Sequence, residues 1–325
     1  PGVSPLDAFA TAGSACRRRW YWSSPEEGIE LAGIGAACEI TASGKARFDE
    51  VRRQWERLVK DRIEFSDLDS HGEASRRLVA GPQVFGGFSF RPSREGENGA
   101  ATVATPWEGF PDACFILPEL MVGSKAGHTW ITVNRVVDPA TDLDGLAEEI
   151  EQDIRRLCDG AGGDAGPPLP PGALMVVDSD FKAWERSVRT LVDAIKSGRF
   201  DKAVLARSVR VEAPRPFDAA RVLRALAADY PMCYRFAIQL GERCFLGSTP
   251  ELLVAKDGHA VRSMALAGSA PRGANLAEDA RIGASFLADR KNLEEHGVVV
   301  AAVRAALRPL CSELATPERP GVFKL

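Results

Sequence analysis

The stretch 234–265, YRFAIQLGERCFLGSTPELLVAKDGHAVRSMA, has the pattern of short consecutive strands. Glycine-containing turn sequences, Gly241-Glu242-Arg243 and Lys256-Asp257-Gly258, separate its apolar runs. Strands that follow one another through tight turns pair antiparallel, so this stretch predicts an antiparallel meander. The predicted strands are residues 234–240, 244–247, 252–255 and 260–265.

Further elements are predicted on both sides of the meander. Residues 184–195 carry an apolar stripe at helical spacing, which indicates an amphipathic helix lying on a core. Alternating apolar residues over 202–211 predict a strand that begins at Lys202. Residues 219–229 and the long segment 277–307 are predicted helices.

The first half of the chain mixes sheet and helix, and a linker follows it. The sequence DGAGGDAGPPLPPG at 159–172 disfavours helix and central strand, which predicts a surface linker. We therefore expect an N-terminal half, 1–158, and a second region, 173–325, as parts of one intertwined domain. The predicted elements of the first half are strands 34–40, 84–90, 113–117 and 129–137, helices 46–60 and 144–157, and a long loop at 91–106.

Composition excludes several classes of protein. The 325 residues include 41 Lys and Arg against 45 Asp and Glu, a net charge of −4, so no basic excess is present to hold nucleic acid. No apolar run is long enough to cross a membrane. Seven cysteines without a CxxC pair indicate neither a disulfide framework nor a zinc cluster. We expect a cytoplasmic protein without nucleic-acid or membrane partners.

The two ends of the sequence indicate a fragment of a longer chain. It starts at Pro1 without a methionine, and residues 322–325 have the apolar character of the beginning of a strand. We expect the fold to be incomplete at the C-terminus. A fragment of this kind would expose sheet edges, which predicts aggregation or poor expression on its own.

Four local features of the second region carry groups suited to chemistry. They are Lys202, Glu251, the loop 266–273 (LAGSAPRG) and the helical triplet Glu294-Glu295-His296. Taken singly, each is better explained structurally, because a lysine that opens a strand or an acidic pair on a helix is usually a solvated charge. Their order within one run of strands and helices favours a shared function instead.

The segments that contain these features resemble successive signatures of the chorismate-utilising enzymes. This group includes isochorismate synthase, salicylate synthase, anthranilate synthase component I and aminodeoxychorismate synthase. Near the N-terminus, WYWSSP at 20–25, LAGIG at 31–35 and FGGFSFRP at 85–92 are similar, more weakly, to isochorismate synthases, most of all the menaquinone type. The resemblance covers nearly the whole chain. Its four signatures are FDKAVLARSV, FLGSTPELLV, MALAGSAPRG and LADRKNLEEHGVVVAAVRAAL.

The resemblance implies a reaction and two principal roles. In isochorismate synthases water attacks C2 of chorismate while the C4 hydroxyl leaves, without redox change. Lys202 matches the general base for the water and Glu251 the general acid for the leaving hydroxyl. We expect both in a dry cavity beside Val204, Leu246 and Leu252, because burial favours the uncharged forms that these roles need.

The resemblance also implies Mg²⁺ as cofactor and a loop that binds substrate. Glu295 matches a magnesium ligand, and in the family a second acidic ligand comes from a later motif that these residues do not contain. Ala267, Gly268 and Ser269 match the loop that contacts chorismate, where glycine allows close approach and serine donates a hydrogen bond. Three roles are open for His296: it could orient Glu295, contact the substrate or serve the structure alone.

Two positions favour one member of the family. Anthranilate synthases resemble the segment around Lys202 but usually carry Gln there, and aminodeoxychorismate synthases place a nucleophilic Lys where this chain has Ala267. Both differences favour isochorismate synthase, an isomerase, in menaquinone or siderophore biosynthesis. The alternatives are salicylate synthase, another chorismate-utilising enzyme, and an inactive fragment or chorismate-binding protein.

The fold class follows from the resemblance, and the meander supports it. We expect an α+β fold of layered, large antiparallel β-sheets with helices packed outside. The small-molecule partner is expected to be chorismate. The oligomeric state is left open, and a monomer is compatible with the sequence.

Overall fold

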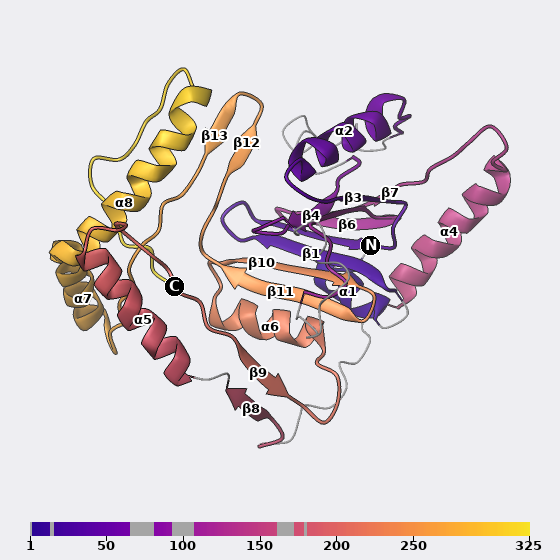
Figure 1. Ribbon diagram of the computed structural model, residues 1–325. Coiled ribbons are helices and arrows are strands. Elements are labelled where there is room, and N and C mark those ends of the chain that lie inside the picture. Colours follow the sequence, from indigo (N-terminus) through magenta and orange to yellow (C-terminus); the bar gives the residue numbers. More distant parts are fainter. Residues whose placement is uncertain (1, 14–15, 66–80, 93–106, 161–171, 179–180) are drawn as a thin grey trace. The chain divides into compact units, whose positions relative to one another are not determined.

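The computed structural model describes residues 2–13, 16–65, 81–92, 107–160, 172–178 and 181–325 (Figure 1). It confirms an α+β fold with antiparallel sheets. The chain forms two compact units, and Asp218–Thr249 lies in the first of them rather than with its sequence neighbours. The predicted division at 159–172 stays a prediction, because residues 161–171 lie outside the described residues. The first unit is Pro1–Pro167 with Asp218–Thr249, and the second is Pro168–Phe217 with Pro250–Leu325.

A six-stranded antiparallel sheet forms the centre of the first unit, in the order β11-β10-β1-β2-β6-β7. The N-terminal strand β1 pairs on one side with β2 and on the other with β10, which comes about 200 residues later. Its strands are β1 (Arg18–Ser24), β2 (Ile29–Ile34), β6 (Leu120–Lys125), β7 (His128–Val133), β10 (Tyr234–Leu240) and β11 (Arg243–Thr249).

Both faces of this sheet are buried, so adjacent residues of β1 enter different cores. Tyr21 packs in a cluster with helices α1 (Pro5–Ala12) and α6 (Ala219–Asp229). Trp20 packs on the opposite face with residues of a smaller sheet. The six-stranded sheet is therefore the middle layer of the unit (Figure 1).

The smaller sheet has the order β3-β5-β4, from β3 (Cys38–Ala42), β4 (Phe85–Phe88) and β5 (Ala113–Leu117). Helix α2 (Arg47–Lys60) packs against it through Val51. Helix α4 (Leu143–Asp159) packs into the cluster that contains Tyr21 on the opposite face of the six-stranded sheet. It does so only near its C-terminal end, where Leu157 is buried.

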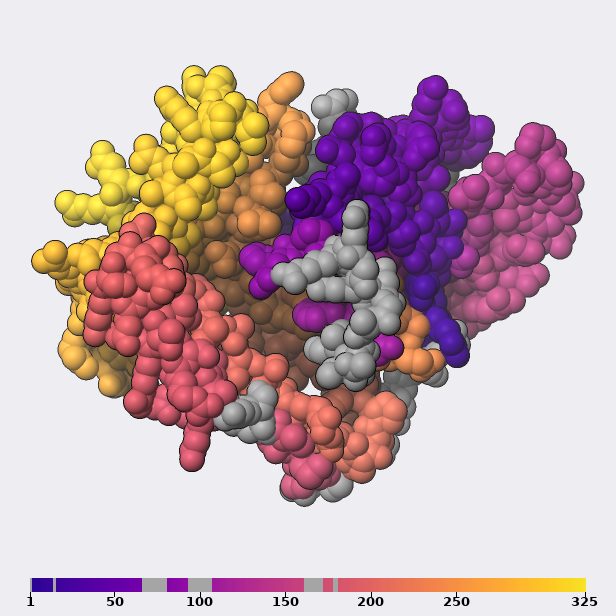
Figure 2. Space-filling model, in the orientation of Figure 1, coloured from indigo at the N-terminus to yellow at the C-terminus, as the bar shows by residue number. Residues whose placement is uncertain are grey.

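The second unit contains helices and two short pairs of antiparallel strands. Helix α5 (Phe181–Lys196) lies on the surface (Figure 2). Among the described residues of this unit, only Ala194 and Asp279 are buried. The other elements are β8 (Met175–Asp178) paired with β9 (Val209–Glu212), β12 (Ala255–Asp257) paired with β13 (Ala260–Arg262), α7 (Leu276–Ala288), α8 (Arg290–Leu307) and the 3₁₀ turn η3 (Arg308–Leu310).

Most predicted elements are confirmed. The structure contains the helices predicted at 46–60, 144–157, 184–195 and 219–229, with ends that differ by a few residues at most. The strands predicted at 113–117 and 234–240 match within one residue, and those at 84–90 and 244–247 overlap β4 and β11. The loop predicted at 91–106 lies almost wholly outside the described residues.

Two strands predicted in the first half are confirmed only in part. Only residues 35–37 of the strand predicted at 34–40 form a turn, between the end of β2 and the start of β3, because Gly35 has a φ of 73°, a conformation that ends an extended strand. The strand predicted at 129–137 stops at Val133. Strands β1, β2 and β6 and helix α1 are additional to the prediction.

Three predictions in the second half are also confirmed only in part. Only residues 209–211 of the strand predicted at 202–211 lie in a strand, β9, because β8 is short and pairs with that end alone. The meander is interrupted, because its first hairpin belongs to the six-stranded sheet and the second is separate. The helix predicted at 277–307 breaks at Asp289, whose extended backbone ends α7 and begins α8.

Among the described residues, no helix combines the length and the apolar character needed to cross a bilayer.

Candidate functional site

Lys202 and Glu295 form an ion pair in the second unit. The Nζ atom of Lys202 lies 3.3 Å from Oε1 of Glu295, and the two side chains are 24% and 37% exposed. Lys202 follows α5 through a turn in which Gly198 has a φ of 72°. The structure thus brings together the predicted general base and the predicted magnesium ligand.

Helix α8 separates the two neighbouring glutamates. Its N-cap is Asp289, whose Oδ1 accepts a hydrogen bond from the Asn292 amide at 2.8 Å. Successive residues of a helix are about 100° apart around its axis. Glu294 consequently pairs with Arg290 at the surface, while Glu295 pairs with Lys202.

The predicted substrate loop lies against both C-terminal helices. Gly268 has a φ of 78°, and a Cβ atom there would lie 3.1 Å from the ring of Phe286 and 3.2 Å from Oδ1 of Asn292. Glycine is therefore required both by the backbone conformation and by the close packing. Ala267 is half-buried, and Ser269 is exposed.

His296 holds the start of this loop. Its Nε2 lies 3.1 Å from the carbonyl oxygen of Ala265. Because a carbonyl only accepts, Nε2 carries the proton and donates. Of the three roles left open for His296, this contact supports a structural one at the loop that leads to Ala267.

Glu251 lies on residues 250–254, between β11 and β12, and its side chain is exposed. The Leu252 carbonyl accepts a hydrogen bond from the Met264 amide at 3.0 Å. Hydrogen bonding therefore links the Glu251 segment to the residue that precedes Ala265. Direct proximity of Glu251 to Lys202 stays a prediction.

The dry cavity expected around Lys202 and Glu251 stays a prediction. Val204 is 86% exposed, and Leu246 belongs to the other compact unit. The exposure of Val204 follows from the missing strand at 202–208. Without a neighbouring strand alongside it, this segment leaves its apolar side chains in solvent.

The described residues alone do not fit a magnesium site. Glu295 offers the carboxylate oxygen that Mg²⁺ prefers, but its close neighbour is the ammonium group of Lys202. Within the described ranges no group of three or more His, Cys, Asp or Glu side chains could hold a metal ion. Glu295 stays a candidate ligand.

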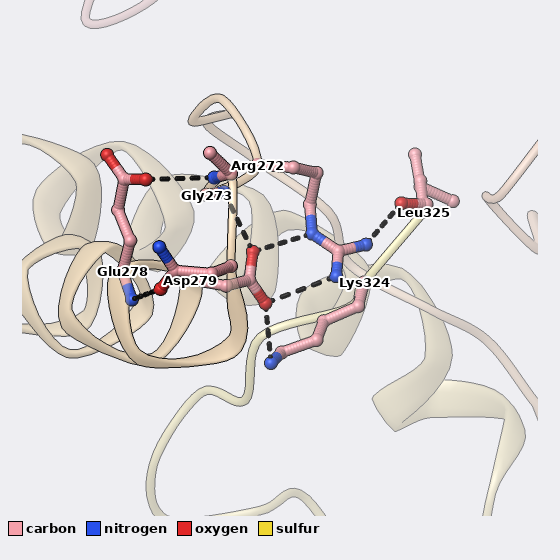
Figure 3. Close-up of polar contacts among 8 residues, drawn as sticks. Arg272, Gly273, Glu278, Asp279, Lys324 and Leu325 are labelled. Atoms are coloured by element: carbon pink, nitrogen blue, oxygen red, sulfur yellow. Dashed lines mark hydrogen bonds and ion pairs between the residues drawn. The ribbon is translucent and has the colours of Figure 1, made fainter.

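Asp279 lies outside the four sequence features suited to chemistry, yet its carboxylate accepts four hydrogen bonds beside the loop (Figure 3). Arg272 donates from Nε to Oδ1 at 2.7 Å and from Nη2 to Oδ2 at 3.1 Å. The Gly273 amide reaches Oδ1 at 3.1 Å, and Nζ of Lys324 reaches Oδ2 at 2.8 Å. Hydrogen bonds from Arg272, Lys324 and Gly273 hold the pKa of Asp279 well below its usual range. The only sequence signal was an acidic pair in the first turn of a helix.

The chain belongs to the family described as chorismate binding enzyme, whose sequence model matches residues 1–325. It is 32% identical over 312 residues to isochorismate synthase MenF of Bacillus subtilis, covering 94% of this chain and 62% of that protein. It is 28% identical over 326 residues to the salicylate biosynthesis isochorismate synthase of Pseudomonas aeruginosa, covering 99% of this chain and 64% of that protein.

Solved structures support the fold. The menaquinone-specific isochorismate synthase MenF of Escherichia coli superposes with a TM-score of 0.66 at 21% identity, over 95% of this chain and 61% of that one. The 2,3-dihydroxybenzoate-specific isochorismate synthase DhbC of Bacillus anthracis superposes with a TM-score of 0.64 at 24% identity, over 98% of this chain and 66% of that one. The chain spans less than two thirds of the length of the two curated relatives named above.

Proposed function

We propose that this chain acts as an isochorismate synthase, an isomerase that converts chorismate to isochorismate. The observation that carries the proposal is the ion pair between Lys202 and Glu295, because the family resemblance assigns both residues to the reaction site. The hydrogen bonds at Ala265 and Met264 add support, since they connect α8 with the substrate loop and with the Glu251 segment.

The reaction needs one proton acceptor and one proton donor. In the proposed step Lys202 acts as general base and takes a proton from water as the water oxygen bonds to C2 of chorismate. Glu251 protonates the C4 hydroxyl, which leaves as water while both double bonds of the ring diene shift. One water is added and one is lost, so the product is an isomer and no electrons are exchanged.

The loop 267–269 is proposed to bind a carboxylate of the substrate. The exposed Ser269 hydroxyl is available as a donor, and the glycine before it leaves the backbone open to close approach. Mg²⁺ is the proposed cofactor, and when bound it would neutralise substrate charge. Glu295 is the ligand that this chain would contribute.

Two residues distinguish this proposal from other reactions of the family. Lys202 fits a reaction that activates water, and Ala267 provides no nucleophile at the position where aminodeoxychorismate synthases carry lysine. Salicylate synthase shares the lysine and remains the second candidate. The relatives include isochorismate synthases named for menaquinone and for vibriobactin, so the pathway is left open.

The test is product identification from chorismate with Mg²⁺, by chromatography and NMR. We expect isochorismate, without consumption of ammonia or glutamine. Lys202→Ala and Glu251→Gln should each lower turnover by about 10²- to 10⁴-fold with an unchanged circular dichroism spectrum. Salicylate as product would favour the second candidate. Chorismate binding without turnover would contradict the proposal in favour of a binding protein.

A further inference from the structure

The carboxylate of Asp279 occupies an unusual position for a charged group. Its side chain is 8% exposed, and it lies in the first turn of α7 in a unit whose other described residues, apart from Ala194, are not buried. A buried carboxylate is costly unless donors satisfy it. Both oxygens of Asp279 accept two hydrogen bonds each, and three of the four donors are on Arg272 and Gly273 (Figure 3).

These contacts fix the end of the substrate loop. A Cβ atom on Gly273 would lie 2.2 Å from the backbone nitrogen of Asp279, so the loop backbone lies directly against the first turn of α7. The Ala274 amide donates to Glu278 at 2.9 Å, and Asn275 caps the helix through the Glu278 amide. The chain from 272 to 275 is therefore bound at successive positions.

The start and middle of the loop have their own supports. His296 binds the Ala265 carbonyl, and Gly268 packs against Phe286 of α7 and Asn292 of α8. Residues 266–271 lie between these two supported ends. Ser269 is only three residues before Arg272, so a shift of the Arg272 end would move the atoms proposed to contact substrate.

We propose that Asp279 is a positioning residue for the substrate loop, acting through Arg272 and Gly273 on Gly268 and Ser269. The inference rests on the proposed function for its kinetic consequence, but its structural part stands on the contacts alone. Asp279 is bonded to the loop end and not to the residues assigned to chemistry, so its effect on the reaction would be indirect.

The form of the contact makes the carboxylate difficult to replace. Two parallel hydrogen bonds from a guanidinium group to a carboxylate fix both distance and orientation. In Asp279→Asn one oxygen becomes an amide nitrogen, which cannot accept from Arg272 or Lys324. In Arg272→Lys the charge remains but the planar pair of donors is lost. The two substitutions weaken the same contact from opposite sides.

The first experiment measures backbone hydrogen exchange of the full chain by mass spectrometry. We expect peptides that cover 265–273 to exchange at least about tenfold faster in Asp279→Asn than in the unaltered protein, and by a smaller factor in Arg272→Lys. The matched control is Asn275→Ala, which removes the cap of α7 but keeps the Arg272–Asp279 contact. It should raise exchange in the first turn of α7 only.

Unchanged exchange at 265–273 in both loop variants would overturn the proposal, as would equal acceleration in Asn275→Ala. If Asp279→Asn does not fold, Arg272→Lys decides the question. This readout needs no enzymatic activity. Failure of the unaltered protein to convert chorismate would therefore reject the proposed function while leaving the positioning role decided by exchange.

The second experiment is a double-mutant cycle with Ser269→Ala, using kinetics with chorismate. We expect Asp279→Asn to raise KM about tenfold with a smaller change in kcat, because a displaced binding loop weakens ground-state and transition-state binding alike. In the Ser269→Ala background the same substitution should raise KM less than about threefold. If the effects of Asp279→Asn and Ser269→Ala on KM simply multiply in the double variant, Asp279 does not act through Ser269.

Discussion

The ammonium group of Lys202 lies 3.3 Å from the carboxylate of Glu295, and the chain reaches this arrangement from two elements far apart in sequence. One residue follows the turn after α5, and the other lies on α8. Both side chains are partly exposed, so the pair contributes no more than about 1 kcal/mol to stability. We therefore expect the ion pair to matter for the proposed reaction rather than for stability.

Glu295→Gln should separate function from stability. Because the ion pair is partly exposed, we expect the free energy of unfolding to fall by less than about 1 kcal/mol in chemical denaturation. Turnover of chorismate should fall by more than about tenfold, since the charge partner of Lys202 and the candidate metal ligand are lost together. The matched control is Glu294→Gln, whose side chain pairs with Arg290 at the surface. Equal losses of activity in the two variants would contradict the assignment of Glu295.

Gly268→Ala tests the geometry of the loop. Gly268 has a φ of 78° and two close neighbours, so the alanine variant should lower the free energy of unfolding by about 1–2 kcal/mol. KM for chorismate should rise as well. Gly283→Ala is the comparison, because Gly283 lies inside α7 with open space around it and alanine there should stabilise by about 0.5–1 kcal/mol. A neutral Gly268→Ala would refute the described conformation.

Asp279 predicts a defined pH dependence of stability. Its pKa is lowered in the folded state, so its stabilisation is complete above the unfolded-state value of about 3.9 and is lost as the pH falls towards the folded-state value. The difference in unfolding free energy between the unaltered protein and Asp279→Asn should therefore be constant from pH 6 to 8 and shrink below about pH 4. Urea denaturation across this range measures it. If the difference in unfolding free energy between the two proteins grew towards acidic pH, the prediction would be contradicted.

Gly33→Ala tests the middle layer of the first unit. A Cβ atom there would lie 2.3 Å from the indole ring of Trp20, and overpacking of this kind costs about 1–3 kcal/mol. Gly87→Ala, in β4 with open space around it, should change stability by less than about 1 kcal/mol. Thermal unfolding followed by tryptophan fluorescence compares the two. Similar melting temperatures would argue against this packing.

Local sequence pattern predicted the helices better than the sheets. Helical periodicity at 46–60 and 219–229 depends on residues within a few turns, and both helices are found. The pairing of β1 with β10 depends on residues far apart in the chain, which no local pattern reports. The segment 202–208 alternates like a strand but has no strand beside it in the described residues, so propensity alone does not make it one.

The sequence signals for the site were equally uneven. The family signatures identified Lys202 and Glu295, and the structure brings these two together. The break at Asp289 could have been predicted, because aspartate is one of the preferred N-cap residues of a helix. The contacts of Asp279 with Arg272 and Lys324 could not have been predicted, since they depend on how the loop folds back onto α7.

The position of β1 between β2 and β10 has a consequence for biosynthesis. Strand β1 cannot complete its pairing during synthesis until residues 234–240 have also emerged from the ribosome. During that interval one edge of β1 has no partner, and the segment 168–217 is synthesised before the partner arrives. Such non-local pairing slows folding and leaves an exposed edge prone to misassembly. We expect nascent chains stalled before residue 234 to depend on chaperones and to be degraded rapidly when released.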